Sequence, residues 1–291
     1  MIADLIYDVG MHNGHDTAHY LSKGFRVIAV EADPALVELA RERFAEPIRS
    51  GQLQLLNVAI GPNEELAKFW ICDAKSEWNS FDVGIASRYG LPCHSIIVQC
   101  LRFRSLLERY GVPCYLKIDI EGNDQFCVSD LDPHDLPRYL SFEMGHLEHL
   151  FALRQLGYTR FKLILQNDHS QLAVDPFSAR EWIKRGLRDY PRLYRAASGL
   201  VSAPRRLAAG HWRPGPSSPN NGRQQYPSGS SGPFGEETDG PWRTLDEVAY
   251  TWVAFQLGHS VHGTPGLHLW NDVHVARDLD VRERSDSDRV P

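Results

Sequence analysis

Near its start the chain has a segment whose residue types and spacing suggest a binding loop. The segment reads YDVGMHNGHDT, residues 7–17, and follows a short apolar run. Gly10 and Gly14 lack a Cβ, so the backbone can approach a ligand closely there. A dinucleotide loop reads GxGxxG and rests a pyrophosphate on a helix N-terminus, whereas this loop reads DxGxxxG and adds Asp8 and Asp16. These acids would repel a phosphate, so the loop indicates a ligand that is cationic or neutral at this end.

A second candidate binding residue is Glu31, which ends the apolar run in VIAVEADP, residues 27–34. It lies 21 residues after Gly10, and in dinucleotide folds an acid about 20 residues after the glycine loop accepts hydrogen bonds from ribose hydroxyls. The ligand therefore has a ribose. A ribose without a pyrophosphate, joined to a cationic amino acid end, describes S-adenosylmethionine.

The elements that must position these residues follow a regular alternation. From residue 4 to about 166, strand-like runs alternate with helical patterns, beginning as βαβαβ, and runs at 114–121, 139–144 and 161–166 bring the strands to about six. Such alternation predicts a mostly parallel sheet with helices on both faces, and ligands of such sheets lie at the carboxyl ends of the strands. Residues 68–100 contain β signals but no helical pattern, which predicts an antiparallel cover inserted into a domain of residues 1–170.

The last third of the chain has a different composition. Residues 180–206 carry eight Lys or Arg against two acids, which predicts a basic helix that clamps an anionic acceptor, contacts an acidic membrane surface, or simply covers the sheet edge. Within the predicted segment 171–243, residues 213–242 are rich in Pro, Gly and Ser and form a lid or a linker. For residues 244–291 we predict a capping box at Thr244 and Glu247, a helix to about Leu257, a late strand and a charged tail from Arg277.

Composition excludes some classes of function. The formal net charge is −6, so nucleic acid is not the expected partner. We expect a cytoplasmic protein, because no leader and no apolar run of about 18 residues is present. The five cysteines are odd in number and form no CxxC pair, which indicates reduced thiols rather than a zinc site.

Four motifs in order, YDVGMHNGHDT, VEADP, NVAIG (57–61) and LKIDIEGND (116–124), resemble those of the FkbM-type methyltransferases. The resemblance covers about residues 4–166, and KIDIEG is its most specific motif; Met11 and His12 depart from the Ala and Asn more usual in that family. It implies an S-adenosylmethionine-dependent O-methyltransferase of the class I Rossmann-like fold, with a mostly parallel seven-stranded sheet and helices on both faces. Such enzymes often act on hydroxyls of saccharides or natural products.

The resemblance also implies which residues contact S-adenosylmethionine. Around the methionine portion it places Gly10, Asn13, Gly14, Asp16 and Thr17, with Asp8 in the same set. Glu31 would hold the ribose, and the adenine would be bordered by Ala32, Asp33, Asn57 and Ala59. Asp119 and Glu121 would face the methionine amino group or the substrate.

Methyl transfer is an in-line displacement, so the protein must align the acceptor oxygen and remove its proton. Asp119 and Glu143 end neighbouring strands and His146 follows, which makes these three the candidate bases or substrate clamps. The plainer alternatives are that Asp119 only binds the cofactor amine, that Glu143 is a solvated strand end, and that His146, like His12 and His274, is an ordinary surface histidine. A Mg²⁺ ion on Asp119 and Glu143 is not favoured, since no third ligand is evident.

The sequence thus predicts methyl transfer from S-adenosylmethionine to a hydroxyl, most often of a sugar or glycan, with a natural-product hydroxyl as the alternative. Two other classes of function remain open, an NAD-dependent oxidoreductase and a non-catalytic nucleoside-binding protein. The DxGxxxG loop argues against the first of these. The sequence indicates neither the acceptor nor the oligomeric state.

Overall fold

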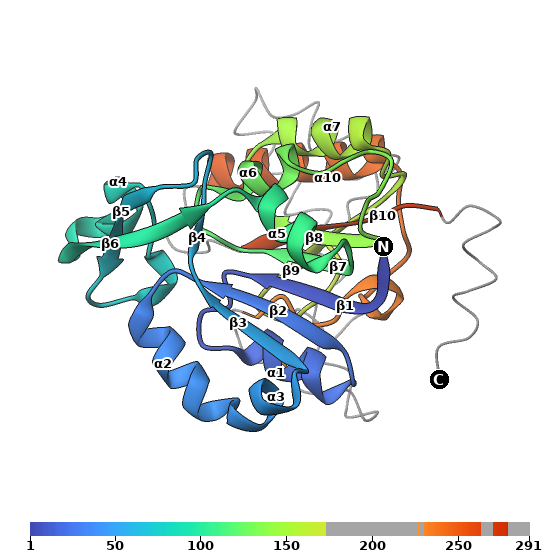
Figure 1. Ribbon diagram of the computed structural model, residues 1–291. Helices are drawn as coiled ribbons and strands as arrows, with labels where there is room; N and C mark the ends of the chain where they lie inside the picture. Colours follow the sequence, from blue (N-terminus) through green and yellow to red (C-terminus); the bar gives the residue numbers. More distant parts are fainter. Residues whose placement is uncertain (173–225, 227–229, 263–269, 279–291) are drawn as a thin grey trace.

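The computed structural model describes residues 1–172, 226, 230–262 and 270–278 (Figure 1). The predicted basic helix at 180–206, most of the predicted lid at 213–242 and the tail beyond residue 278 lie outside the described residues.

The centre of the molecule is a seven-stranded sheet with the order β3-β2-β1-β7-β8-β10-β9 (Figure 1). Its strands are β1 (Ile2–Val9), β2 (Arg26–Glu31), β3 (Leu53–Asn57), β7 (Pro113–Ile118), β8 (Tyr139–Glu143), β9 (Arg160–Leu165) and β10 (Asn271–Ala276). The strands are parallel except β10, which pairs antiparallel with both β8 and β9. The predicted strands and the late strand are confirmed, and the order is that of the class I Rossmann-like methyltransferase fold. Because the chain order reverses between β1 and β7, their carboxyl ends open a crevice for a ligand.

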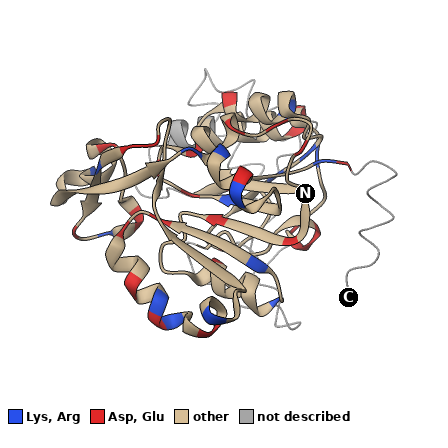
Figure 2. Ribbon diagram, viewed as in Figure 1, with Lys and Arg blue, Asp and Glu red and all other residues tan. Residues whose placement is uncertain are grey.

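Helices cover both faces of the sheet. On one face lie α1 (His15–Ser22), α2 (Pro34–Arg43) and α3 (Ala45–Ser50) (Figure 1). The opposite face is covered by α5 (Phe103–Tyr110), α6 (Asp124–Ser129), α7 (Leu147–Leu156) and α10 (Leu245–His262). Asp33 caps α2 as predicted, since its side chain accepts a hydrogen bond from the Ala35 N–H. Charges of both signs alternate along the outer side of α2, where Glu38 and Arg41 lie 3.4 Å apart (Figure 2).

Each face of the sheet has its own apolar core, because alternate residues of a strand point to opposite faces. Along β1, Tyr7 and Val9 pack beneath α5 to α7, whereas Ile6 packs on the face that carries α1 and α2. Beneath β7 and β8 this second face is covered by residues 230–243 instead of a helix among the described residues. There the Phe234 ring stacks on Tyr115 with centroids 4.3 Å apart and 4° between the planes.

The predicted cover is confirmed as an antiparallel insertion of residues 66–101, here called the cover. It contains β5 (Leu66–Cys72) and β6 (Cys93–Leu101), and β6 also pairs with β4 (Ala59–Ile60). The expectation that it lacks helix is wrong, because three short helical turns connect its strands: η1 (Ser76–Trp78), α4 (Val83–Ala86) and η2 (Arg88–Gly90). Asp82 stabilises the start of α4 by accepting a hydrogen bond from the Gly84 N–H.

The C-terminal expectations are met where the structure describes them. Thr244 and Glu247 exchange hydrogen bonds in the predicted capping box, and the helix they open extends to His262, beyond the predicted Leu257. η3 (Gly235–Glu237) precedes this helix. All five cysteines are free thiols, as predicted. Among the described helices, none is both long and apolar enough to cross a bilayer.

We expect Phe234→Ala to lower the free energy of unfolding by about 3–5 kcal/mol, because Phe234 is only 9% exposed and contacts the rings of four aromatic residues in one core. Chemical denaturation would measure the loss. Phe151→Ala is the matched control, since Phe151 is 49% exposed on α7. If both substitutions had the same small effect, residues 230–243 would not be part of the core.

Candidate functional site

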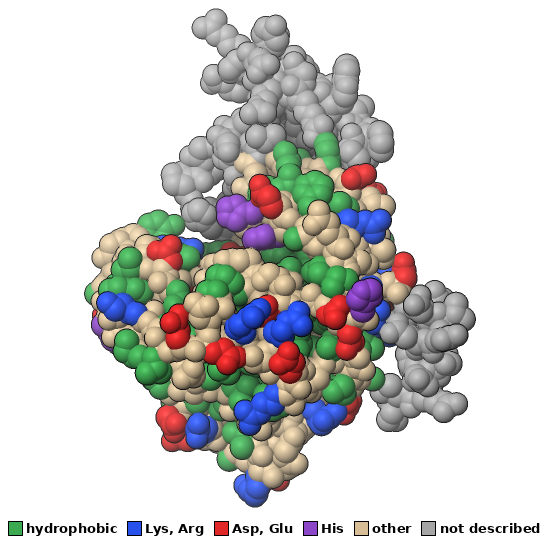
Figure 3. All heavy atoms as spheres, turned by 45° about the horizontal axis from the view of Figure 1, so that its top comes forward, with side chains coloured by type: hydrophobic (Ala, Val, Ile, Leu, Met, Phe, Trp, Pro, Cys, Tyr) green, Lys and Arg blue, Asp and Glu red, His purple; other side chains and the backbone are tan. Residues whose placement is uncertain are grey.

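A cavity of about 310 Å³ opens at the carboxyl ends of β1, β2, β7 and β8, beneath the cover. Its size falls in the range of small-molecule sites, roughly 300–1,000 Å³. Figure 3 shows a hollow on this side of the molecule, between the lobe formed by the cover and the main body. The predicted site residues that line the cavity are Gly10, Asn13, Asp16, Glu31, Ala32, Ala59, Asp119, Glu121 and Glu143. The predicted residues Asp8, Gly14, Thr17, Asp33, Asn57 and His146 are not part of its lining.

Gly10 brings the loops after β1 and β7 together. Its φ is +84°, and a Cβ at this position would lie 1.8 Å from the Asp119 carbonyl oxygen, so a side chain is excluded. The Asp119 N–H donates to the Val9 carbonyl at 2.8 Å, which continues the strand pairing up to the cavity. This close approach places Asp119 beside the first loop.

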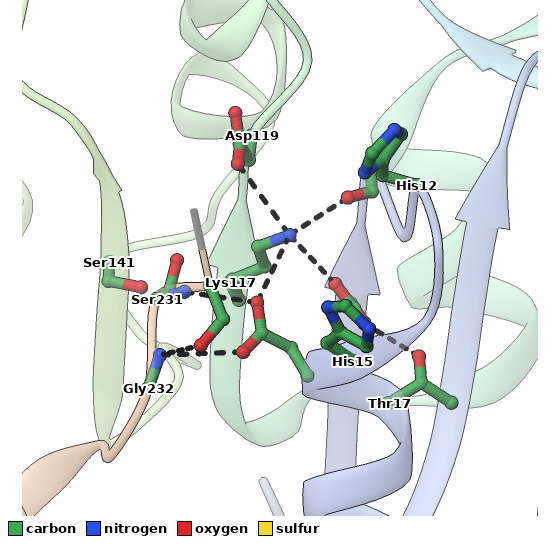
Figure 4. Close-up of polar contacts among 12 residues, drawn as sticks. His12, His15, Thr17, Lys117, Asp119, Ser141, Ser231 and Gly232 are labelled. Atoms are coloured by element: carbon green, nitrogen blue, oxygen red, sulfur yellow. Dashed lines mark hydrogen bonds and ion pairs between the residues drawn. The ribbon is translucent and has the colours of Figure 1, made fainter. Parts of the chain in front are cut away.

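A buried lysine that the sequence analysis did not single out lies in the cavity floor and forms part of its lining. The ammonium of Lys117 is 3.1 Å from Asp8 and 3.8 Å from both Asp16 and Asp119, and it donates to the Gly10 carbonyl at 2.8 Å (Figure 4). Burial by itself would lower the pKa of Lys117, but the three carboxylates raise it, so the lysine stays charged.

The lysine explains why Asp8 and Thr17 lie below the lining. Thr17 donates its hydroxyl hydrogen to Asp8 at 2.6 Å, and Asp8 in turn pairs with Lys117. These two residues support the floor instead of facing the cavity. Lys117 could have been found from KIDIEG, because it stands two residues before Asp119 and therefore shares its face of the strand.

Asp16 is held by a segment more than two hundred residues away in sequence. The Ser231 and Gly232 N–H groups donate to its two carboxylate oxygens at 3.1 and 3.4 Å (Figure 4). Gly232 has φ +68°, and a Cβ there would lie 2.4 Å from the His169 ring, so only glycine fits. The described part of the predicted lid is thus a fixed wall of the site.

Glu31 is fixed by backbone groups at the end of β2. Its carboxylate accepts hydrogen bonds from the N–H groups of His12 at 2.8 Å and Asp33 at 2.9 Å. Burial raises the pKa of Glu31 to about 7, although these two hydrogen bonds oppose the rise. A carboxyl group with this pKa changes from its neutral to its ionised form near neutral pH, and the ionised form is the better hydrogen-bond acceptor.

Asp33 and Asn57, predicted to border the adenine, brace the Glu31 turn instead. The Asn57 amide donates to the carbonyls of Glu31 and Ala32, and Asp33 caps α2 and accepts from Asn79 of the cover. Both side chains are used for local structure because the chain turns sharply between β2 and α2. Gly14 is likewise structural: it begins α1 with φ +73° and packs against Phe44.

The two ends of the cavity differ in polarity. Beneath the cover the lining includes the apolar side chains of Ile60, Phe69, Trp78 and Phe81, beside the polar residues Lys75, Ser76, Glu77 and Asn79. Its width is set by β4 and by the inner face of the cover, where Phe69 packs edge-on against Phe81 at 5.2 Å. This end can take a flat apolar ring.

The opposite end is acidic. Asp119, Glu121 and Glu143 each present a carboxylate oxygen within 4.8 Å of the others, and among the described residues they are the one such group with metal-binding spacing. Burial first, and then the neighbouring acids, raise the pKa of Glu121 to about 7 and that of Glu143 to about 9. Arg88 lies 3.4 Å from Glu121. Carboxyls this crowded favour a positively charged ligand or a hard divalent cation.

His146, a predicted base or substrate clamp, does not line the cavity. The side chain is exposed at the first position before α7, outside the cavity, and its ring contacts His149 at 5.6 Å. Three residues past the strand end, the chain has already turned to start the helix. His12 does line the cavity, whereas His274 is buried within β10, where burial lowers its pKa to about 3.

The acidic end continues past Glu143 to residues that the sequence analysis did not select. Gln166, Asn167, Ser230 and Trp270 line this part. They come from the ends of β9 and β10 and from the 230–243 segment, and no single motif contains them. Only the pairing of β10 between β8 and β9 brings them beside Glu143.

A comparison with protein-family models agrees with the motifs. A family model described as the methyltransferase FkbM domain matches residues 8–159, which is about half of the chain. Among solved structures, a precorrin-6y C5,15-methyltransferase from Geobacter metallireducens GS-15 is similar at a TM-score of 0.31 and 12% identity, over 61% of this chain and 73% of that chain. No curated protein matches the chain.

We expect Glu143→Gln to stabilise the ligand-free protein, and more so at higher pH. The pKa of Glu143 is raised from 4.5 to about 9, so between these values the folded protein binds a proton that the unfolded chain releases. Wild-type stability then falls with rising pH, by up to about 1.4 kcal/mol per pH unit from this group, and glutamine removes that fall. Thermal unfolding at pH 5 and pH 8 would measure it.

Glu148→Gln is the control, because Glu148 is exposed on α7. An advantage of Glu143→Gln that is equal at both pH values would contradict the raised pKa.

Proposed function

The chain belongs to the FkbM family of methyltransferases, and we propose that it transfers a methyl group from S-adenosylmethionine to a hydroxyl group, that of a sugar or glycan. A hydroxyl of another natural product is the alternative acceptor class. The family membership itself identifies the chain as a methyltransferase. The cofactor and the acceptor are what we propose.

The order of groups along the cavity carries the cofactor proposal. The apolar end beneath the cover suits an adenine, Glu31 follows at the end of β2 with a carboxylate for ribose hydroxyls, and the acids at Asp16 and Asp119 come next. That sequence of apolar ring, diol and positive charge is the sequence of groups in S-adenosylmethionine. An NAD pyrophosphate would instead meet carboxylates, which favours the sulfonium cofactor over the dinucleotide.

In the proposed reaction the acceptor oxygen forms a bond to the methyl carbon while the sulfur–carbon bond breaks, and Glu143 takes the hydroxyl proton. Bound S-adenosylmethionine supplies the activated methyl group; the protein holds the oxygen in line and supplies the base. In the ligand-free protein burial and neighbouring acids raise the pKa of Glu143 to about 9. A positive sulfonium nearby favours the ionised form and so prepares the group to accept the proton.

Asp119 has the second role, as the partner of the cofactor amine. It lies 3.8 Å from Lys117, and its side chain is 29% exposed toward the cavity. A positively charged amine there would balance the Asp119 carboxylate, which otherwise shares the single charge of Lys117 with Asp8 and Asp16. His146 is not proposed as a base, because it lies outside the cavity.

A divalent cation on Asp119, Glu121 and Glu143 is the competing route to deprotonation, and the spacing of these three side chains is what favours it. We prefer Glu143 because Lys117 and Arg88 already lie near two of the three carboxylates. The reaction is proposed to take place in the cytoplasm, where the five free thiols would stay reduced.

Calorimetry with S-adenosylhomocysteine and NAD, each added to the full chain, tests the cofactor. We expect S-adenosylhomocysteine to bind and NAD not to bind. Conversion of S-adenosylmethionine with an extract of the native host as acceptor source then separates an enzyme from a non-catalytic nucleoside-binding protein. Binding of NAD alone would overturn the proposal.

We expect Glu31→Gln to weaken binding of S-adenosylhomocysteine by about 1.5–3 kcal/mol, the scale of hydrogen bonds to a charged group. Since the pKa of Glu31 is raised to about 7, wild-type affinity should rise as the pH increases through this value, where the carboxylate forms. The variant should lack that rise. Glu38→Gln, on the exposed side of α2, is the control for a general effect of lost charge.

We expect turnover to survive dialysis against EDTA, because the proposed base is a side chain. In contrast, Glu143→Gln should abolish turnover while S-adenosylhomocysteine still binds. Loss of activity in EDTA that Mg²⁺ restores would assign deprotonation to a metal ion. Mass spectrometry of the acceptor, which gains one methyl in place of hydrogen, is the measurement for both.

A further inference from the structure

Two free cysteines lie directly opposite each other in the cover, where β5 and β6 run side by side (Figure 1). Cys72 ends β5 and Cys93 begins β6, and the two residues are partners in the antiparallel register of these strands. Opposite residues of two paired strands direct their side chains to the same face, so the two thiols are neighbours. We propose that Cys72 and Cys93 form a reversible disulfide, with hydrogen peroxide as the oxidant, and that this bond closes the neck of the loop formed by residues 73–92. The inference does not depend on the proposed function.

The backbone of the two strands suits such a bond. The Asp73 N–H donates to the Pro92 carbonyl at 3.0 Å, whereas the Cys72 N–H turns away from β6 and donates to the Asn79 side chain at 2.9 Å. Because hydrogen-bonded and non-hydrogen-bonded pairs alternate along an antiparallel ladder, Cys72 and Cys93 form a non-hydrogen-bonded pair. The Cα atoms of such pairs are about 4.5 Å apart, within the range of roughly 4.4–6.8 Å found for disulfides. The bond can therefore form while the strands stay paired.

The two thiols differ in exposure, and this assigns the order of the steps. Cys93 is partly exposed, whereas Cys72 is only 3% exposed. The Cys93 thiolate attacks a peroxide oxygen, the O–O bond breaks, and hydroxide leaves a sulfenic acid on Cys93. The Cys72 thiolate then attacks this sulfur, the S–S bond forms, and the S–O bond breaks with loss of a second hydroxide. With the two thiol protons, two thiols and one peroxide give one disulfide and two water molecules.

The other three cysteines are less suited to oxidation. Cys100 is opposite Ala59 of β4, Cys114 lies within β7 and Cys127 within α6, and all three are buried. Burial raises the pKa of each of these thiols, that of Cys114 to about 12. It therefore disfavours the thiolate, which is the form that peroxide oxidises. The register and the exposure together select one pair among the five cysteines.

The bond would act on the part of the cover that lies over the cavity. Ser76, Trp78 and Phe81, all within the loop 73–92, line the cavity. Asn79 of the same loop accepts the Cys72 N–H and donates to Asp33, so the neck of the loop is already connected to the turn after β2. A covalent link at the neck holds the two ends of this loop together and restricts its opening. Because cytosolic thiols are kept reduced, the bond would be transient there and would form under oxidative conditions.

Mass spectrometry of the full chain tests the bond. The protein is reduced with dithiothreitol, treated with hydrogen peroxide, alkylated at its remaining thiols and digested with trypsin without further reduction. We expect residues 69–75 and 89–102 as one linked species, lighter by two hydrogens than the two peptides together, and dithiothreitol should separate them. The absence of this species, or a link that dithiothreitol does not break, would overturn the proposal.

Two variants identify the sulfur atoms, because residues 89–102 also contain Cys100. Cys93→Ser should abolish the linked species. Cys100→Ser, the control on the same strand, should retain it. A linked species that persists in Cys93→Ser would show that Cys93 is not the partner of Cys72.

Hydrogen exchange measures the effect on the loop. Backbone N–H groups of residues 76–81 should exchange more slowly in the oxidised wild type than in the reduced wild type, because the closed neck restricts opening of the loop. Peroxide should cause no such slowing in Cys93→Ser. Equal exchange in the oxidised and reduced wild type would overturn the proposed restriction of the loop.

Discussion

The site depends on one buried cation. Lys117 is almost fully enclosed, and a buried ammonium is tolerated only with partners that offset its desolvation. Those partners are Asp8 in β1, Asp16 in α1 and Asp119 after β7, together with the Gly10 carbonyl. Because each partner comes from a different stretch of chain, the ion network fixes the relative positions of the two loops that form the cavity floor. Removing the lysine alone would leave three carboxylates crowded together without their common counter-charge.

Even with Lys117, acids outnumber cations among the described residues that line the cavity. The pKa values of Glu31, Glu121 and Glu143 are raised because a buried carboxyl group beside other acids resists ionisation. The ligand-free protein therefore stores unfavourable electrostatic energy at its acidic end. Binding of the proposed positively charged cofactor would relieve it, so part of the binding free energy would come from this electrostatic repulsion. Stability is given up where function requires it.

Much of the fold could be predicted from local patterns, and the site only in part. The periodicity of apolar residues predicted the strands and helices of the sheet. Glu31 was predicted because its separation from Gly10 along the sequence is that of one helix and the following strand. Lys117 was missed because its pairing with Asp8 and Asp16 joins residues far apart in sequence. Phe234 lies in a Gly/Pro/Ser-rich stretch that suggested a lid, yet its neighbouring glycines have positive φ and fold the ring into the core. His146 lies outside the cavity lining for a local reason, since a turn of a few residues decides which way a side chain after a strand points.

The 230–243 segment links the cavity to the core of the sheet. Ser231 and Gly232 hold Asp16 at the proposed cofactor site, while Ser230, the preceding residue, also lines the cavity. Phe234 anchors the same segment on Tyr115, beneath β7, and Lys162 of β9 donates to Thr238. A shift of this segment would therefore move Asp16 and this part of the lining together. A helix on this face would pair its backbone N–H groups internally, whereas this glycine-rich segment directs two N–H groups to Asp16 and places Ser230 in the cavity lining.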